Sequence, residues 1–166
     1  RFSGSFDYRF TSLAADYAAA ATHYYDPEKY FNIYVVPQIL SSTGDPTTIS
    51  GFNQRFADWP AGPDLVVVRH TKFGDYANCT SCGTLNTNSK GVVLVHEAGH
   101  YLGLRELWQG GCAEGNNAAT CATKGDLCCD TRPVNANYSC PAPSGNDCSY
   151  HLNIADNHEN YMDYTG

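Results

Sequence analysis

The chain has 166 residues, enough for one domain that buries roughly two-thirds of the surface of its unfolded form. Its net charge of −7 argues against nucleic acid and anionic membranes as partners. No apolar run is long enough to span a bilayer, since the longest block near the central motif is only Val92 to Val95.

The cysteines and sequons indicate a secreted, extracellular glycoprotein with disulfide bonds. Eight cysteines in a small chain are typical of an oxidising compartment, and N-x-S/T sequons at Asn78 and Asn137 are candidate glycan sites. The chain opens on Arg1 without a leader, as we expect of a processed form. Cys79 and Cys82 have no second pair at metal-binding spacing, so we interpret this C-x-x-C as a local disulfide.

The N-terminal segment predicts a short strand and then a helix. Residues 1–10 alternate well enough for a strand but are too few to decide it. Thr11 or Ser12 can cap a helix over residues 13–25, where frequent alanine gives high helix propensity. We expect His23, on this helix, to pack or to face solvent.

Two further segments predict strands. Residues 29–40 (KYFNIYVVPQIL) and the run from Leu65 to Arg69 are rich in β-branched side chains. Residues 41–51 are expected to form a loop, and His70 is expected to be a polar residue that closes the second strand. Residues 71–90 predict a loop or a bridged edge hairpin, of the kind that often lines a substrate groove.

The stretch from Gly91 to Trp108 (GVVLVHEAGHYLGLRELW) contains an H-E-x-x-H motif. His96 and His100 are four residues apart, so a helix presents both imidazoles on one face to a single metal ion. Glu97 is displaced by roughly 100° around the axis and can lie beside the open position of the metal, as a general base. This arrangement predicts a zinc hydrolase.

The ends of this helix are predicted from its flanking residues. Asn88 or Ser89 is a good N-cap, and Gly103 is expected to leave the helix in a left-handed conformation. Glu106 follows three residues later and is the preferred third metal ligand, because carboxylates bind zinc at distances similar to those of imidazole. His151 and His158 are the alternatives.

The C-terminal part changes character. Six of the eight cysteines lie between residues 110 and 148 among Gly, Asn, Pro and Ser, which predicts an irregular region stapled by disulfides. We expect the adjacent Cys128 and Cys129 to bond elsewhere, because a ring between neighbours is strained. Further on, the sequence NYMDY predicts a tight turn at Met162, the single methionine of the chain.

These motifs together resemble the metzincin metallopeptidases, whose pattern is H-E-x-x-H-x-x-G-x-x-H followed by a methionine turn. Three segments, HEAGHYLGLRELWQGGC, GDLCCDTRPV and NYMDYTG, are similar in sequence to the pappalysin (cytophagalysin) branch of this family. Glu106 stands in place of the usual third histidine. The resemblance implies an α+β, zincin-like fold with a twisted mixed sheet, a backing helix and an active-site helix. It implies one catalytic domain, 1–166, with an upper part of about 1–103 and a disulfide-rich lower part of about 104–166.

The resemblance also implies roles for individual residues. His96 and His100 would bind zinc, Glu97 would be the general base, Tyr164 would stabilise the oxyanion, and Met162 would form an apolar floor under the metal. Cys112 and Cys148 match a bridged pair of the family, and Cys140 would then bond to one of Cys121, Cys128 and Cys129. Asp126 and Asp130 could hold Ca²⁺, although we prefer to interpret them as turn residues.

The predicted function is that of a secreted zinc endopeptidase that cleaves peptide bonds by a zinc-bound water activated by Glu97. The alternative is a weak or inactive metzincin-like scaffold that acts as a secreted binding or effector protein. This alternative is supported by Glu106, which replaces the usual third zinc-binding histidine. A hydrolase of non-peptide amides would use the same site. We expect a protein or peptide substrate, a monomer, and neither nucleic-acid nor membrane partners.

Overall fold

A computed structural model describes residues 9–11, 24–41, 43, 45–54, 65–74, 90–114, 121–123, 125–132, 134–136 and 159–163. The chain divides into two compact units, Arg1–Tyr101 and Leu102–Gly166, which are treated separately below. The prediction of one catalytic domain, with an upper part that ends near residue 103 and a lower part that follows it, stays a prediction. Among the described residues, no helix has the length and apolar character needed to cross a membrane.

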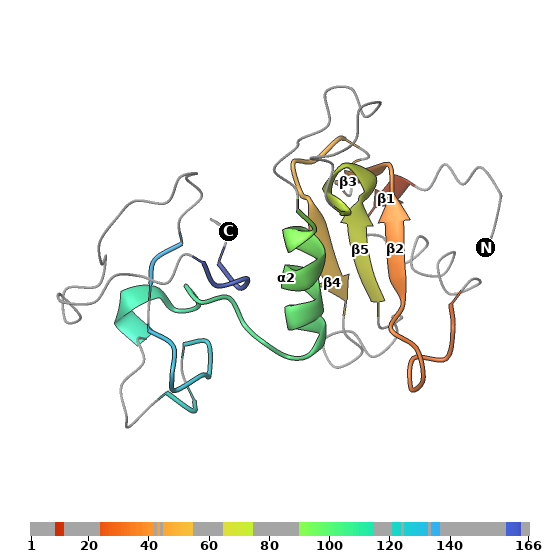
Figure 1. The fold of residues 1–166 in the computed structure, drawn as a ribbon. Helices are drawn as coiled ribbons and strands as arrows, with labels where there is room; N and C mark the ends of the chain where they lie inside the picture. Colours follow the sequence, from red (N-terminus) through yellow and green to blue (C-terminus); the bar gives the residue numbers. More distant parts are fainter. Residues whose placement is uncertain are drawn as a thin grey trace. The chain divides into compact units, whose positions relative to one another are not determined.

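The centre of the first unit is a three-stranded sheet in the order β2-β5-β4 (Figure 1). Strand β2 (Ile33–Val36) runs parallel to β5 (Leu65–Arg69), and β4 (Gly51–Gln54) runs antiparallel to β5. Strand β5 confirms the strand predicted from its run of β-branched residues. Its first four side chains are 0% exposed, as expected of a central strand that is covered on both faces.

The predicted strand over residues 29–40 is two strands. Strand β2 ends at Val36, and β3 (Gln38–Leu40) pairs in parallel with β1 (Arg9–Thr11) in a separate two-stranded sheet. The break falls at Pro37, which has no N–H to give to a ladder. The described part of the predicted loop 41–51 is irregular apart from an isolated antiparallel bridge between Leu40 and Pro46 and its last residue, which begins β4.

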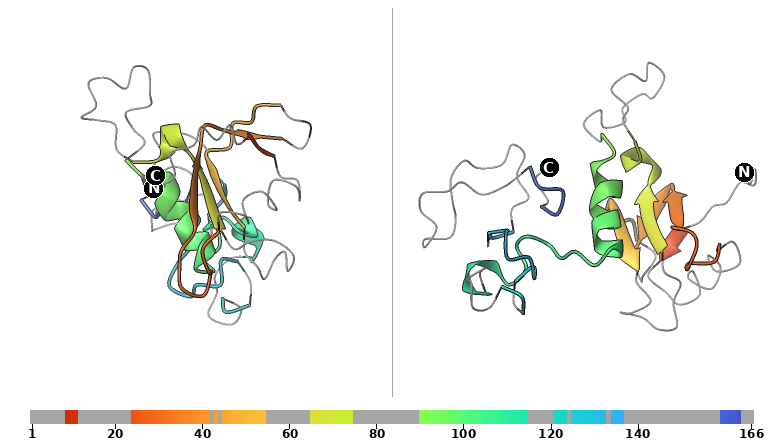
Figure 2. Two further views of the ribbon diagram at one scale, coloured as in Figure 1. Left: turned by 90° about the vertical axis from the view of Figure 1, so that its right-hand side faces the viewer. Right: turned by 60° about the horizontal axis from the view of Figure 1, so that its bottom comes forward.

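Helix α2 (Val92–Tyr101) packs against β4 and β5, and two further views show it along the same side of the sheet (Figure 2). The opposite face carries a core of aliphatic and aromatic side chains. This core contains Val36, Ile39, Leu65 and Val67, with Tyr24, Tyr34 and Phe52 packed against it. The predicted N-terminal helix, apart from Tyr24 and Tyr25, lies outside the described residues.

A buried amide fastens the loop before β2. The Asn32 side chain donates to the carbonyl oxygens of Tyr25 (2.9 Å) and Tyr30 (3.2 Å), and its oxygen accepts from the Tyr25 N–H (3.0 Å). The backbone carbonyl of Asn32 accepts a hydrogen bond from the Val66 N–H. Asn32 therefore holds the loop together through its side chain and joins it to the central strand β5 through its backbone.

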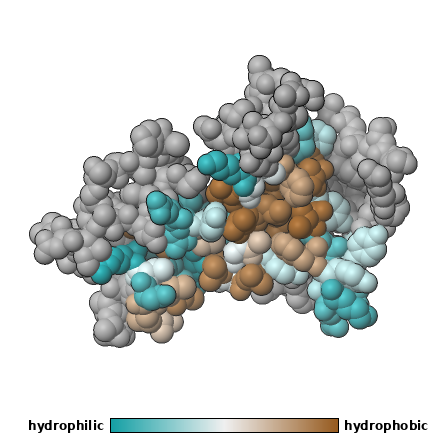
Figure 3. Space-filling model, in the orientation of Figure 1, coloured by the Kyte–Doolittle hydropathy of each residue, from teal (hydrophilic) through white to brown (hydrophobic). Residues whose placement is uncertain are grey.

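Apolar residues gather over the middle of the first unit in the space-filling view, where α2 and β5 lie in Figure 1 (Figure 3). Helix α2 supplies Val92, Val93, Leu94 and Val95, of which Val95 is 46% exposed. Its first turn is thus apolar on most sides, and the polar residues of the motif follow.

The second unit is irregular in its described part, as predicted, and contains one short 3-10 helix, η2 (Gly111–Glu114). A small core forms between Leu107, Val134 and Met162, with Trp108 packed against it. Cys121 and Cys129 form a disulfide, which confirms that Cys129 bonds to a residue other than its neighbour. Cys112 is also disulfide-bonded, and its partner lies outside the described residues.

Candidate metal centre

Glycine and the preceding loop determine where α2 begins. Gly91 has a φ of 75°, its N–H donates to the Gly74 carbonyl, and its own carbonyl accepts from Leu94 and Val95. Gly91 is therefore the residue at the N-cap. The predicted start near Asn88 or Ser89 is wrong by about three residues, because a positive φ at Gly91 reverses the chain just before the first turn.

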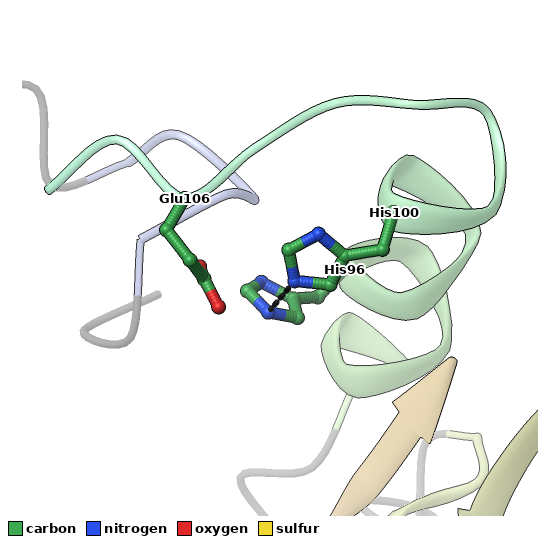
Figure 4. A group of neighbouring side chains, drawn as sticks. All are labelled: His96, His100 and Glu106. Atoms are coloured by element: carbon green, nitrogen blue, oxygen red, sulfur yellow. Dashed lines mark hydrogen bonds between the residues drawn. The ribbon is translucent and has the colours of Figure 1, made fainter. Parts of the chain in front are cut away.

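The two motif histidines lie together one turn apart on α2. Their Nε2 atoms are 3.1 Å apart, and their rings meet edge-on with centroids 4.6 Å apart (Figure 4). Two nitrogens bound to one tetrahedral zinc ion at about 2.1 Å would lie roughly 3.4 Å apart. His96 is buried and His100 is half-buried. The pair is therefore close to the geometry that a shared metal ion requires.

Glu97 lies on a different side of the helix, next to β4. It is 6% exposed, and its Cγ would lie 3.1 Å from a Cβ at Gly51. The helical spacing accounts for this, because consecutive residues are about 100° apart around the axis. The structure thus places the buried Glu97 side chain between the helix and β4.

The chain turns sharply after α2. Gly103 has a φ of 97°, which confirms the predicted left-handed exit. Glu106 follows, 9% exposed, and its carbonyl accepts from the Gln109 N–H. One ligand atom each from His96, His100 and Glu106 lies within 4.8 Å of the others, with the carboxylate directed toward the rings (Figure 4).

Met162 lies in a tight turn, as predicted. The side-chain oxygen of Asn160 accepts a hydrogen bond from the Met162 N–H at 2.9 Å. The backbone carbonyl of Asn160 accepts one from the Asp163 N–H, also at 2.9 Å. The Met162 carbonyl accepts from the N–H of Leu107, the residue after Glu106. The turn is therefore fastened to the segment that carries Glu106.

Several predicted site residues lie outside the described residues. These are Tyr164, His151, His158, both sequon asparagines, and Cys79, Cys82, Cys140 and Cys148. Their predicted roles stay predictions. His70, in contrast, is exposed at the start of a 3-10 helix (His70–Lys72) that follows β5, which agrees with the expected polar strand end.

The Asp126 carboxylate is engaged inside its own turn. It accepts from the Cys128 N–H at 3.0 Å and from the Thr131 hydroxyl. Burial, together with the charges of Asp126 and Asp130, raises the pKa of the Cys128 thiol. Within the described residues neither aspartate belongs to a group of three ligands, so the structure supports the turn interpretation and gives calcium no support.

The fold, of the α+β class, and this candidate site resemble those of metzincin-like metallopeptidases. A family model, Peptidase_M43, described as Pregnancy-associated plasma protein-A, matches residues 15–166. The chain belongs to this family, the pappalysins. The resemblance stated from the motifs is therefore confirmed.

Relatives and solved structures agree with this assignment. The chain is 36% identical over 83 residues to an extracellular metalloprotease of Pyricularia oryzae and 37% identical to one of Sordaria macrospora. Each match covers 50% of this chain and 26% of the relative, so the chain spans about a quarter of their length. These names agree with the predicted extracellular location.

Among solved structures, mature mirolysin of Tannerella forsythia in complex with a cleaved peptide is 28% identical, with a TM-score of 0.55. The match covers 82% of this chain and 44% of that one. Mirolysin in complex with compound 9 is 25% identical, with a TM-score of 0.56, over 86% of this chain and 47% of that one. These structures support the zincin-like fold.

Proposed function

We propose that this chain is a secreted zinc endopeptidase in which His96, His100 and Glu106 hold the metal ion. The observation that carries the proposal is the 3.1 Å separation of the two Nε2 atoms beside a buried Glu97. Two imidazoles and one carboxylate are a known catalytic donor set for zinc, which leaves a fourth position open. A zinc ion bound there would polarise the scissile carbonyl and make water more acidic.

Glu97 supplies the proton transfers in this proposal. Its carboxylate takes a proton from the water that attacks the carbonyl and delivers it to the departing amine. A structural metal site has no need of a second buried acid on the neighbouring helical position. The Tyr164 hydroxyl, assigned by resemblance, donates a hydrogen bond to the oxyanion that develops on the carbonyl.

We prefer a peptide over a small amide as the substrate. Mature mirolysin, a solved structure that this chain resembles, is in complex with a cleaved peptide. A site of the same family in this chain is therefore expected to accept a peptide.

The test is the variant Glu97→Ala, assayed on an unfolded protein substrate with the zinc content measured in the same preparation. We expect cleavage to fall by at least about 100-fold while the zinc content is unchanged. Glu28→Gln, an exposed residue of the loop before β2, is the matched control and should retain full activity.

Equal cleavage by the wild type and Glu97→Ala would contradict the proposal. Sub-stoichiometric zinc and no turnover in the wild type would favour the alternative, a metzincin-like scaffold that acts by binding. Hydrolysis of a small amide without cleavage of any peptide would favour the non-peptide hydrolase.

A further inference from the structure

One glycine separates the sheet from the active-site helix. A Cβ at Gly51, the first residue of β4, would lie 2.9 Å from Val93 Cγ1, 3.0 Å from the Val67 carbonyl oxygen and 3.1 Å from Glu97 Cγ. Carbon atoms in ordinary contact are about 3.5–4.0 Å apart. The φ of Gly51 is not in the left-handed region, so the backbone conformation alone does not require glycine. The position requires glycine for space.

The two helix atoms in this contact belong to one stripe of α2. Val93 and Glu97 are four residues apart, so they lie one above the other on the face that meets β4. Gly51 therefore determines how closely the strand approaches the very residue proposed as the base. The signal in the sequence is a glycine inside a strand, which is typical of close backbone approach.

The strand cannot retreat to make room for a side chain. Gly51 is paired with Val68 in the β4–β5 ladder, and the Arg69 N–H donates to the Ser50 carbonyl at 2.9 Å. Val67 and Val68 are fully buried, so β5 is held by packing on both faces. A methyl group at Gly51 must therefore displace α2 as a whole or the side chains of Val93 and Glu97.

We propose that Gly51 is a positioning residue for Glu97, whose place in the site depends on the absence of a side chain on β4. This inference rests on the proposed function, because the displacement matters to catalysis only if Glu97 is the base. The contact itself can be tested without any activity.

The first experiment is a cycle of thermal unfolding midpoints measured on the metal-free protein. Gly51→Ala should lower the midpoint by roughly 3–10 °C in the wild-type background. In a Glu97→Ala background, which lacks Cγ, the same substitution should cost measurably less, because only the contacts with Val93 and the Val67 carbonyl remain. In a Glu97→Gln background, which keeps Cγ, the full cost should return. Equal costs in all three backgrounds would overturn the proposal.

The second experiment measures kcat and KM of the zinc-loaded protein in a Val93→Ala background, which removes the 2.9 Å contact and protects folding. Adding Gly51→Ala should lower kcat by roughly 10- to 100-fold, because a misplacement of about 1 Å can cost that much. KM and zinc content should stay within about twofold. Ser50→Ala, the preceding residue, is the control and should leave kcat unchanged.

The two experiments fail in different ways. A raised KM with an unchanged kcat would show that Gly51 contacts substrate instead of positioning Glu97, and it would overturn the inference. A wild type without peptidase activity would refute the proposed function, while the unfolding cycle would still decide whether Gly51 and Glu97 are coupled.

Discussion

Met162 offers a test of whether the methionine turn supports the protein or the metal. The resemblance implies an apolar floor under the ion, whereas the structure gives the side chain a packing role. Met162 is 6% exposed and packs with Leu107, Val134 and Trp108. We expect Met162→Ala to destabilise this core and Met162→Leu to preserve it.

The expected size follows from burial. Removing a buried methionine side chain beyond Cβ costs about 2–5 kcal/mol, whereas a volume-conserving change to leucine usually costs less than about 1.5 kcal/mol. At about 2–4 °C per kcal/mol for a chain of this size, a loss of about 3 kcal/mol lowers the unfolding midpoint by roughly 6–12 °C. Leucine should lower it by no more than roughly 6 °C.

The assay is thermal unfolding followed by near-ultraviolet circular dichroism, first with a chelator and then with one equivalent of zinc. If packing determines the role of Met162, the difference between the alanine and leucine variants is the same in both conditions. Equal midpoints for the two variants, or a difference that arises only with zinc, would refute the packing argument and favour a role at the metal.

Three further predictions concern other residues. Glu106→Gln should weaken zinc binding by more than about 100-fold and Glu106→His by less than about 10-fold, in competition with a coloured chelator; unchanged binding by Glu106→Gln would direct the search to His151 or His158. Asn32→Ala should lower the free energy of unfolding in urea by about 2–3 kcal/mol, because three hydrogen bonds are lost. Asn32→Asp should cost at least as much, because it would bury a carboxylate against the carbonyl oxygens of Tyr25 and Tyr30. Leu127 is 39% exposed and has a φ of 67°, a conformation that costs less for glycine than for leucine. Leu127→Gly should therefore raise the free energy of unfolding by about 0.5–1 kcal/mol in the same urea assay. A loss of stability would show that the Leu127 side chain packs.

The sequence predicted the elements whose residues specify them locally. The β-branched run at Leu65 predicted β5, and the i, i+4 spacing predicted that the two histidines lie together on one face of α2. Gly103 and Met162 were predicted from turn chemistry, since a positive φ and a tight turn restrict the residue types that fit. In each case the signal lies within a few consecutive residues.

The parts that depend on distant partners were not predicted. Strand β4 (GFNQ) contains no β-branched residue, and it is a strand because β5 pairs with it. The helix start was placed too early because Asn88 and Ser89 are good caps in isolation, whereas the chain reverses at Gly91. The contact between Gly51 and Glu97 joins residues far apart in sequence, so the glycine in β4 could indicate a close approach but not the helix residue that it meets.

The hydrogen bond from Leu107 to Met162 has a consequence for the order of assembly. It joins positions about 55 residues apart, so closing that loop costs chain entropy that nearby contacts do not. Glu106 precedes Leu107, and its surroundings are therefore complete only after the methionine turn has been synthesised and has docked. If Glu106 is the third ligand, as proposed, a nascent chain that ends before this turn would hold the Glu106 carboxylate less firmly, and it would bind zinc more weakly than the finished unit.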